Sequence, residues 1–327
     1  MRIRLVTPAP RRSRNGNRVT ALRWARVFRS LGHRVSVRQP DSEPGSDRDD
    51  LLVALHAERS AGAIRRFHEA RPDVPIVVAL TGTDVYGEGF ARPGSAAARS
   101  LAIADRLVAL QPLAALRVPA SERDKVRVIR QSAPRFAGAA EPSSSRFDVA
   151  VIGHLRPVKD PFRAALAARE LPADSRVRIV HVGGAGDAAM REAAESERER
   201  NPRYEWLGER PRREALRVLA GSRLAVVSSL SEGGANVISE AAVAGVPILA
   251  SRVDGNVGLL GSDYPGLFPA GDTAALARLL RRAETEPEFL DRLRERVARL
   301  APLFEFERER ESWRALLAEI AGRSPAA

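Results

Sequence analysis

One stretch of the sequence, residues 228–250, restricts the fold more than any other. It reads SSLSEGGANVISEAAVAGVPILA and follows an apolar run, Leu224–Val227, with the length of a buried strand. Small, helix-compatible residues occupy 236–244, and a glycine and a proline then end that helix before a second apolar run at 246–250. The order strand, glycine loop, helix, strand predicts a parallel α/β sheet.

The same stretch carries residue types suited to a phosphorylated ligand. A helix N-terminus that follows a glycine loop exposes N–H groups and a partial positive charge, which suit a phosphate. Glu232 lies in the loop and Glu240 lies eight positions later, and carboxylates accept hydrogen bonds from vicinal hydroxyls. A phosphate site beside two such carboxylates suits a nucleotide sugar, which carries both phosphates and vicinal hydroxyls. A surface loop with one exposed acid on its helix is the other interpretation.

Length and charge limit the class of protein. The 327 residues suffice for two domains. The 53 basic against 41 acidic residues give a net charge of +12, but the arginines alternate with acids, as in 191–200 and 292–299, which indicates solvated helix faces. A nucleic-acid-binding protein would carry a dense basic stripe with interleaved aromatic residues. Cysteine is absent and no apolar segment has transmembrane length, so we expect a cytoplasmic protein without integral membrane contact or nucleic-acid partner.

The remaining chain predicts two α/β domains joined by a short linker. The linker is placed at 139–145, where small residues replace apolar periodicity. The first domain takes residues 1–138 plus 305–322, and the second takes 146–304. The apolar spacing between 304 and 320 predicts the last helix, and a disordered tail is expected at 323–327. A loop is expected at 251–258.

The central stretch resembles the nucleotide-sugar site of family 4 glycosyltransferases of the GT-B type. The resemblance rests on Glu-Gly-Gly, the second glutamate and Ala-Gly-Val-Pro-Ile at this distance. It implies two Rossmann-like domains facing each other across a cleft, with the last helix crossing back to the first domain. It further implies that Glu240 binds the ribose hydroxyls, that Glu232 binds the sugar, and that neither a cofactor nor a metal is required. The loop residues implied to bind the donor diphosphate are Gly233, Gly234, Ala235, Asn236 and Val237.

Two further segments resemble donor-binding parts of the family. In Gly153-His154-Leu155-Arg156-Pro157-Val158-Lys159, the lysine matches a family lysine that neutralises the diphosphate. His154 stands where the family has an arginine, and Arg156 is close enough to replace it; a basic surface turn is the alternative interpretation. Gly183 and Gly184 resemble the loop beside the base and ribose pocket, and the segment 204–208, which ends in Gly208, resembles a turn near the base.

The first domain supplies the candidate acceptor site. Gly16 falls where the family has the second glycine of a loop near the acceptor and donor, with Asn15 in place of the first; an ordinary Asn-Gly turn is the alternative. His56 follows a buried strand, where ligands bind or where a structural histidine packs. Thr83 and Asp84 follow another strand, and Asp84 either acts on a ligand or caps the next helix. The arginines that suit an anionic acceptor are Arg11, Arg12, Arg14 and Arg18.

Over its full length the pattern is most similar to selenosugar synthases, which join a hexose from UDP-glucose or UDP-N-acetylglucosamine to the selenium of selenophosphate in selenoneine biosynthesis. The residues that carry this similarity include SRNGNRVTALRWA, LTGTDVY and GHLRPVKDP. The arginines alone indicate only an anionic acceptor. A family 4 glycosyltransferase with a sugar, lipid or polyol acceptor and a sugar-nucleotide epimerase of the same fold are the alternatives.

Overall fold

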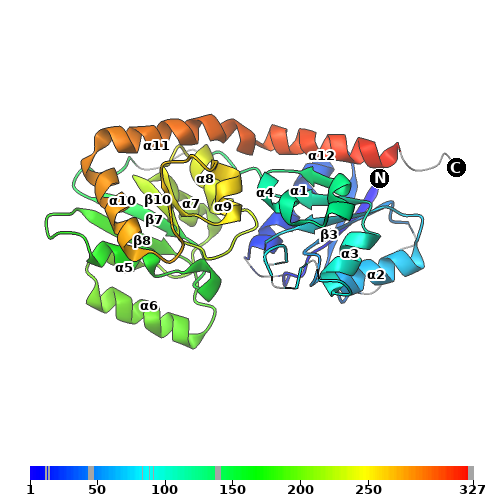
Figure 1. Cartoon of the computed structure of the whole chain (residues 1–327), viewed down its shortest axis with the longest axis horizontal. Coiled ribbons are helices and arrows are strands. Elements are labelled where there is room, and N and C mark those ends of the chain that lie inside the picture. Colours follow the sequence, from blue (N-terminus) through cyan, green and yellow to red (C-terminus); the bar gives the residue numbers. More distant parts are fainter. Residues whose placement is uncertain are drawn as a thin grey trace. The chain divides into compact units, whose positions relative to one another are not determined.

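The chain forms two compact units in the computed structural model (Figure 1). The structure describes residues 1–322 except 12, 14, 43–47, 83, 88, 91 and 137–140. Unit 1 comprises residues 1–131 and 306–327, and unit 2 comprises residues 132–305. The first segment of unit 1 ends at 131, earlier than the expected end of the first domain at 138, and the Ala133 N–H donates to the Phe304 carbonyl at 3.0 Å within unit 2. Residues 139–140 of the expected linker and the expected tail lie outside the described residues.

Unit 1 is built on a parallel sheet of six strands with the order β2-β1-β3-β4-β5-β6. The strands are β1 (Arg2–Val6), β2 (Arg34–Arg38), β3 (Leu51–Leu55), β4 (Ile76–Leu80), β5 (Arg106–Ala109) and β6 (Val126–Val128). The helices are α1 (Gly16–Ser30), α2 (Ala61–Ala70), α3 (Ala96–Ile103), α4 (Pro112–Arg117), the 3₁₀ helix η1 (Ala120–Lys125) and α12 (Phe306–Ala321).

Alternate residues of these strands enter two separate apolar cores, one on each face of the sheet. On one face, Trp313 of α12 packs edge-on against Trp24 and Phe28 of α1, with ring centroids 4.8 and 4.7 Å apart. The Trp24 indole N–H donates to the buried carboxylate of Glu309 at 2.8 Å. The final helix is therefore part of the core of unit 1, as the sequence predicts.

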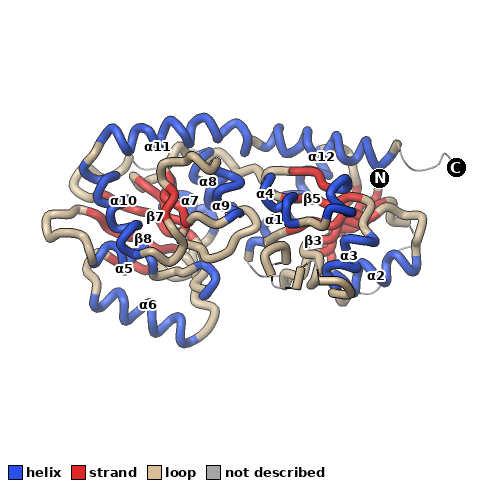
Figure 2. The backbone as a smooth tube through the Cα atoms, viewed as in Figure 1, coloured by secondary structure: helices blue, strands red, loops and turns tan. Residues whose placement is uncertain are grey.

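Unit 2 contains a second parallel sheet of six strands with the order β12-β11-β10-β7-β8-β9. Its strands, red in Figure 2, are β7 (Phe147–Ile152), β8 (Val177–Val182), β9 (Tyr204–Trp206), β10 (Leu224–Val227), β11 (Ile248–Ser251) and β12 (Leu267–Phe268). The helices are η2 (Pro157–Lys159), α5 (Arg163–Arg169), α6 (Ala188–Arg200), α7 (Arg212–Ala220), α8 (Asn236–Val243), α9 (Asp254–Leu260), α10 (Thr273–Thr285), α11 (Pro287–Leu300) and η3 (Ala301–Phe304).

The strand order reverses once in each unit. In unit 2 the chain runs outward from β7 through β8 to β9, and then returns to place β10, β11 and β12 on the other side of β7. In unit 1 the reversal lies between β1 and β3. Ligands of open α/β sheets bind beyond the carboxyl ends of the strands at such a reversal. The ends of β7 and β10 are therefore the first place to search unit 2 for a site.

The expected loop at 251–258 is wrong, because Asp254–Leu260 forms helix α9. Two glycines lower the helix propensity of this segment. Burial of Asn256, Leu259 and Leu260 against the body of unit 2 outweighs that cost. The two-residue strand β12 was also not predicted, since it is too short to show a period.

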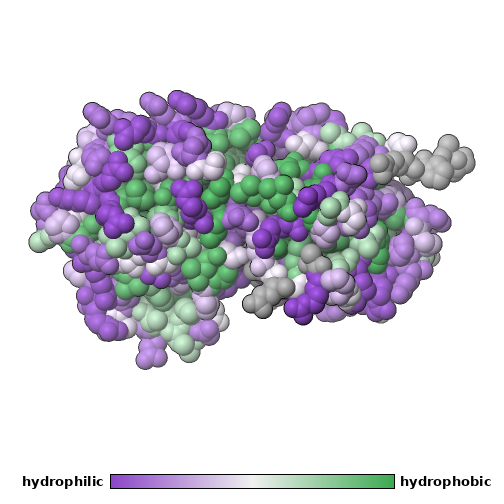
Figure 3. Space-filling model, viewed as in Figure 1, coloured by the Kyte–Doolittle hydropathy of each residue, from purple (hydrophilic) through white to green (hydrophobic). Residues whose placement is uncertain are grey.

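Surface charges of opposite sign lie close together along the helices, as the sequence predicts. Arg282 pairs with Glu286 on α10, and Arg294 pairs with Asp291 on α11. In the face shown in Figure 3, hydrophilic residues are spread over both units without forming one continuous block. Among the described residues, no helix combines the length and apolar character needed to cross a membrane.

Candidate functional site

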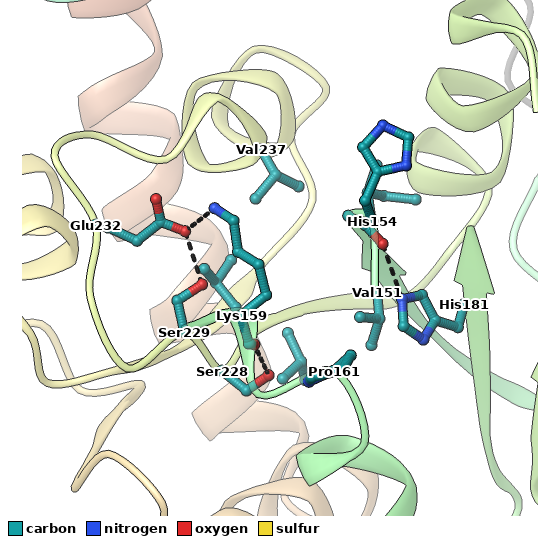
Figure 4. A pocket seen from close by; sticks show the side chains of 13 residues that line it. Val151, His154, Lys159, Pro161, His181, Ser228, Ser229, Glu232 and Val237 are labelled. Carbon is teal, nitrogen blue, oxygen red and sulfur yellow. Dashed lines mark hydrogen bonds and ion pairs between the residues drawn. The ribbon is translucent and has the colours of Figure 1, made fainter. Parts of the chain in front are cut away.

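Unit 2 has a pocket at the reversal of its strand order (Figure 4). It encloses about 340 Å³ of empty space, counting space that is open to solvent. The carboxyl ends of β7, β8 and β10 form its floor, and η2 and the loop before α8 complete its wall. Its lining residues are Val151, Ile152, Gly153, His154, Lys159, Pro161, His181, Val226, Val227, Ser228, Ser229, Glu232 and Val237.

Lys159 and Glu232 meet on one side of this pocket. The Lys159 ammonium forms an ion pair with Glu232 Oε1, and the Ser229 hydroxyl donates to the same oxygen at 2.7 Å (Figure 4). The Glu232 side chain is 10% exposed and the Lys159 side chain is 28% exposed. The two residues that the sequence assigned to one donor site are thus in direct contact, although 73 positions separate them.

Backbone contacts tie the η2 turn to the loop after β10. The Ser228 hydroxyl donates to the Asp160 carbonyl at 2.9 Å, and the Leu230 N–H donates to the Val158 carbonyl at 2.9 Å. Asp160 ends η2 in the left-handed region, with φ of 46°. These contacts fix the backbone on both sides of Lys159.

A buried layer behind the Glu232 loop was not predicted. The Ser251 hydroxyl donates to the Ser229 carbonyl at 2.5 Å, and the Asn256 amide donates to the Ser251 carbonyl at 3.0 Å. A Cβ on Gly255 would lie 2.0 Å from the Glu232 carbonyl oxygen, so α9 can approach this loop only with glycine there. The sequence signal available was the polar pair Ser251 and Asn256 directly after an apolar strand.

Helix α8 presents its N-terminus to the pocket. It begins at Asn236 without a side-chain cap, and Val237 in its first turn lines the pocket. Glu240 lies three positions after Val237, on the same face one turn further along. It does not line the pocket, and its carboxylate accepts a hydrogen bond from the Arg212 guanidinium at 2.6 Å. Gly233, Gly234 and Ala235 lie in the loop that leads to this helix.

His154 and the second glycine loop form the opposite side of the pocket. His154 Nδ1 accepts a hydrogen bond from the Gly184 N–H at 3.1 Å. A Cβ on Gly183 would lie 1.8 Å from the Gly153 carbonyl oxygen, so the backbones after β7 and β8 touch there. Gly208 adopts a φ of 72°, and its carbonyl accepts from the Gly183 N–H at 2.9 Å. Arg156 is exposed and does not line the pocket, so its predicted role remains a prediction.

His181 is a buried neutral histidine beneath this wall. Its Nε2 lies 3.0 Å from the Gly153 carbonyl and therefore carries the hydrogen, while Nδ1 lies 3.0 Å from the Tyr204 hydroxyl and accepts from it. Burial lowers the pKa of His181 to about 4. This residue was not predicted to be functional, because a histidine inside an apolar strand gives no signal of its partners.

This burial predicts a pH-dependent loss of stability. Because the folded pKa of His181 lies below the ordinary value near 6.5, its full contribution to the free energy of unfolding is present above pH 6.5. That contribution is lost as the pH drops toward 4. The contribution reaches about 3 kcal/mol at the acid end. Urea unfolding at pH 7.5 and pH 4.5 measures it, and His181→Gln should show a smaller difference between the two than the wild-type protein. Equal differences would contradict the assignment, and His68→Gln, on the exposed face of α2, is the control.

The candidate residues of unit 1 lie near the carboxyl ends of β1, β3 and β4. Asn15 caps α1 by accepting from the Arg18 N–H at 3.0 Å, and Gly16 is the first helical residue. Arg11 is exposed, and the Arg18 Nε is buried without a hydrogen-bond partner in the described part of the chain. Arg12, Arg14 and Thr83 lie outside the described residues.

Asp84 and His56 form a buried pair in unit 1. The Asp84 carboxylate accepts from the N–H groups of Ala57, Thr81 and Gly82 at 2.9, 3.1 and 2.8 Å. His56 Nδ1 lies 3.9 Å from that carboxylate, and burial lowers the pKa of His56. His56 also has a φ of 71°, a strained value for a non-glycine residue. Asp84 thus binds backbone N–H groups that follow β3 and β4, with His56 close to it, whereas the next helix, α3, is capped by the Ser95 side chain.

No metal-binding arrangement is present in the part of the chain that the structure describes, since three or more His, Asp or Glu side chains nowhere gather closely enough to hold an ion. The pocket instead combines the Lys159 ammonium, the Glu232 carboxylate, serine hydroxyls and an uncapped helix N-terminus, and Glu240 lies one turn further along that helix. This set of groups suits a ligand that carries both phosphates and hydroxyls.

Comparison with known proteins identifies the class. Residues 137–299 match the family described as "Glycosyl transferases group 1". No curated protein sequence gives a significant match. The matched range contains every residue that lines the pocket.

Solved structures show the same fold over nearly the whole chain. Anabaena Alr3699/HepE in complex with UDP has a TM-score of 0.79 at 16% identity, covering 98% of this chain and 100% of that one. Sucrose-phosphate synthase from Thermosynechococcus elongatus has a TM-score of 0.76 at 17% identity, covering 98% and 99%. Trehalose 6-phosphate synthase from Burkholderia multivorans has a TM-score of 0.71 at 14% identity, covering 96% and 79%. The protein is a glycosyltransferase of the GT-B fold, as the sequence predicts.

Proposed function

We propose that the protein transfers a hexosyl group from UDP-glucose or UDP-N-acetylglucosamine to selenophosphate and forms a selenosugar. The observation that carries the donor assignment is the contact of Lys159 with Glu232 in a pocket at the strand reversal of unit 2. The structures of Alr3699/HepE with UDP and with UDP-glucose support a UDP-sugar as the donor. The full-length resemblance to the selenosugar synthase SenB supports the acceptor.

The donor replaces one partner of the ion pair. In the empty pocket the Lys159 ammonium is neutralised by Glu232. The diphosphate of a bound donor brings more negative charge than this carboxylate and takes over the ammonium. Glu232 keeps its hydrogen bond from Ser229 and turns its remaining acceptor capacity to the hydroxyls of the sugar. Binding of the donor therefore separates the ion pair, so that Lys159 binds the diphosphate and Glu232 binds the sugar hydroxyls.

During transfer, negative charge develops on the leaving diphosphate, next to the positive groups of the pocket. The bond between the anomeric carbon and the diphosphate oxygen breaks, and UDP leaves with the electron pair. Lys159 and the N-terminus of α8 stabilise that leaving group, because both are held in place before the reaction. The selenium of selenophosphate forms the new bond to the anomeric carbon, and water then cleaves the Se–P bond, which releases inorganic phosphate and leaves the selenol of the sugar.

The acceptor side depends on cationic residues of unit 1. Arg11 and Arg18 flank the capped N-terminus of α1, after the loop that follows β1. The Arg18 Nε is buried and has no partner in the described part of the chain, which suits an acceptor that carries a phosphoryl group. These residues support an anionic acceptor, and selenophosphate rests on the resemblance.

A hydroxyl acceptor is the second candidate function. The group 1 match and the structural relatives named for sucrose-phosphate and trehalose 6-phosphate synthesis favour it. Both products are sugar phosphates, so a phosphorylated sugar would also satisfy the arginines of unit 1. The two candidates share the donor site and differ only in the nucleophile.

Anaerobic incubation with selenophosphate and each UDP-sugar tests the proposal. Mass spectrometry should reveal the selenium isotope pattern at the mass of a selenohexose, with one UDP released for each product. Release of UDP only with a hydroxyl acceptor would replace selenophosphate by that acceptor. Absence of UDP release with every donor and acceptor would overturn the donor assignment as well.

A further inference from the structure

Arg212 holds the carboxylate of Glu240 at the edge of the donor pocket. Arg212 is the first residue of α7, and its Nη2 lies 2.6 Å from Glu240 Oε1 on α8. The Glu240 side chain is 10% exposed, whereas the Arg212 side chain is 41% exposed. A charge-assisted bond that approaches from the solvent side thus fixes a carboxylate that is largely enclosed.

The position of this arginine is unfavourable for its own helix. A helix N-terminus carries a partial positive charge, so a cation in the first turn of α7 is repelled by it. The acidic residue that would suit this end of α7 is Glu214, two positions further on. The contact with Glu240 offsets the repulsion, which indicates that Arg212 serves the carboxylate of α8 and not the stability of α7.

We propose that Arg212 is a positioning residue that sets the selectivity of the pocket for ribonucleoside over deoxyribonucleoside diphosphates. This inference rests on the proposed function, in which Glu240 binds the ribose hydroxyls. A glutamate side chain has three rotatable bonds, and ordering it on ligand binding costs conformational entropy. Arg212 orders it beforehand, so a ribose with both hydroxyls meets a carboxylate already in place.

The arginine contact uses one acceptor position, on Oε1 of Glu240, of the about four that an ionised carboxylate offers. Val237, one turn earlier on the same helix face, lines the pocket. A nucleoside that extends from the pocket along this face reaches Glu240 next.

The test pairs protein variants with a ligand that lacks one hydroxyl. Binding of UDP and of 2′-deoxy-UDP is measured by calorimetry for the wild-type protein, Arg212→Ala, Glu240→Ala and Arg213→Ala. Arg213 is the matched control, because it is the neighbouring exposed arginine on α7. A hydrogen bond to a charged group accounts for about a tenfold or larger preference for UDP in the wild-type protein.

Arg212→Ala should lower the affinity for UDP about five- to tenfold and change that for 2′-deoxy-UDP less than twofold, so that the preference collapses. Arg213→Ala should keep the preference. An unchanged preference in Arg212→Ala, with Glu240→Ala losing it, would overturn the role of Arg212 alone. An unchanged preference in Glu240→Ala would overturn the ribose assignment, and absence of UDP binding by the wild-type protein would overturn the proposed function.

A second variant guards against a merely structural effect. Arg212→Lys keeps the charge and loses the planar guanidinium, so it should show a preference between those of the wild-type protein and Arg212→Ala. Loss of α7 packing would weaken the binding of UDP and of 2′-deoxy-UDP equally in every Arg212 variant. Such parallel losses of affinity would overturn the proposal.

Discussion

Lys159→Ala is expected to lower kcat by about 10²- to 10³-fold, the loss typical of removing one preorganised group that stabilises transition-state charge. The Lys159 ammonium lies in the pocket of unit 2. Hydrogen bonds that involve Ser228, Val158 and Leu230 fix the backbone around it. The KM for the donor should rise much less, because the α8 N-terminus and the carboxylates still bind. Steady-state release of UDP measures both constants.

The sequence offers a matched control for this prediction. Lys125 is the only other lysine, and it pairs with Glu122 in unit 1, where its ammonium also donates to the Ala102 carbonyl. Lys125→Ala should keep turnover close to that of the wild-type enzyme. If Lys159→Ala also turned over at the wild-type rate, the leaving-group role of Lys159 would have to be abandoned.

Gly183→Ala is expected to destabilise unit 2 by about 3 kcal/mol or more, the upper part of the range for overpacked sites. The new Cβ would stand 1.8 Å from the Gly153 carbonyl oxygen and 2.9 Å from the His154 nitrogen. Both contacts are with backbone, so no side chain can rotate away and the ends of β7 and β8 must separate. In a unit of this size, the melting temperature should fall by roughly 6–12 °C.

Gly186→Ala is the control for this clash, because its Cβ would lie 3.6 Å from the Leu155 carbonyl, an ordinary contact. It should melt close to the wild-type temperature. Donor binding should also weaken in Gly183→Ala, since Gly153 and His154 line the pocket. A Gly183→Ala protein with unchanged melting and donor affinity would show that the two loops are not in contact.

The strands were predictable because their short apolar runs show no helical periodicity that would compete with a strand. Leu224–Val227 has the bounds expected from the sequence. Like Phe147–Ile152 and Val177–Val182, it is a strand of a parallel sheet built on a short apolar run. The carboxyl ends of these strands then bring Lys159 and Glu232 to one pocket. The resemblance of their motifs assigned these two residues to one site, and the strand order explains why they meet.

The partners within the site could not be derived in this way. The contact of Arg212 with Glu240 joins two helices whose relative rotation depends on packing throughout unit 2. The layer formed by Ser251 and Asn256 depends on α9, a glycine-containing helix that local propensity disfavours. Asp84 shows a related limit, because an acid after a strand can serve a ligand or bind its own backbone, and only the folded loop distinguishes the two.

Unit 1 is discontinuous in sequence, and this affects the order in which the two units complete their cores. Residues 1–131 leave Trp24 and Phe28 without Trp313 until residues 306–321 have been synthesised. Unit 2 is continuous in sequence and can close its core before that. The unit whose synthesis begins first is thus the one whose core is completed last, when Trp313 packs against Trp24 and Phe28.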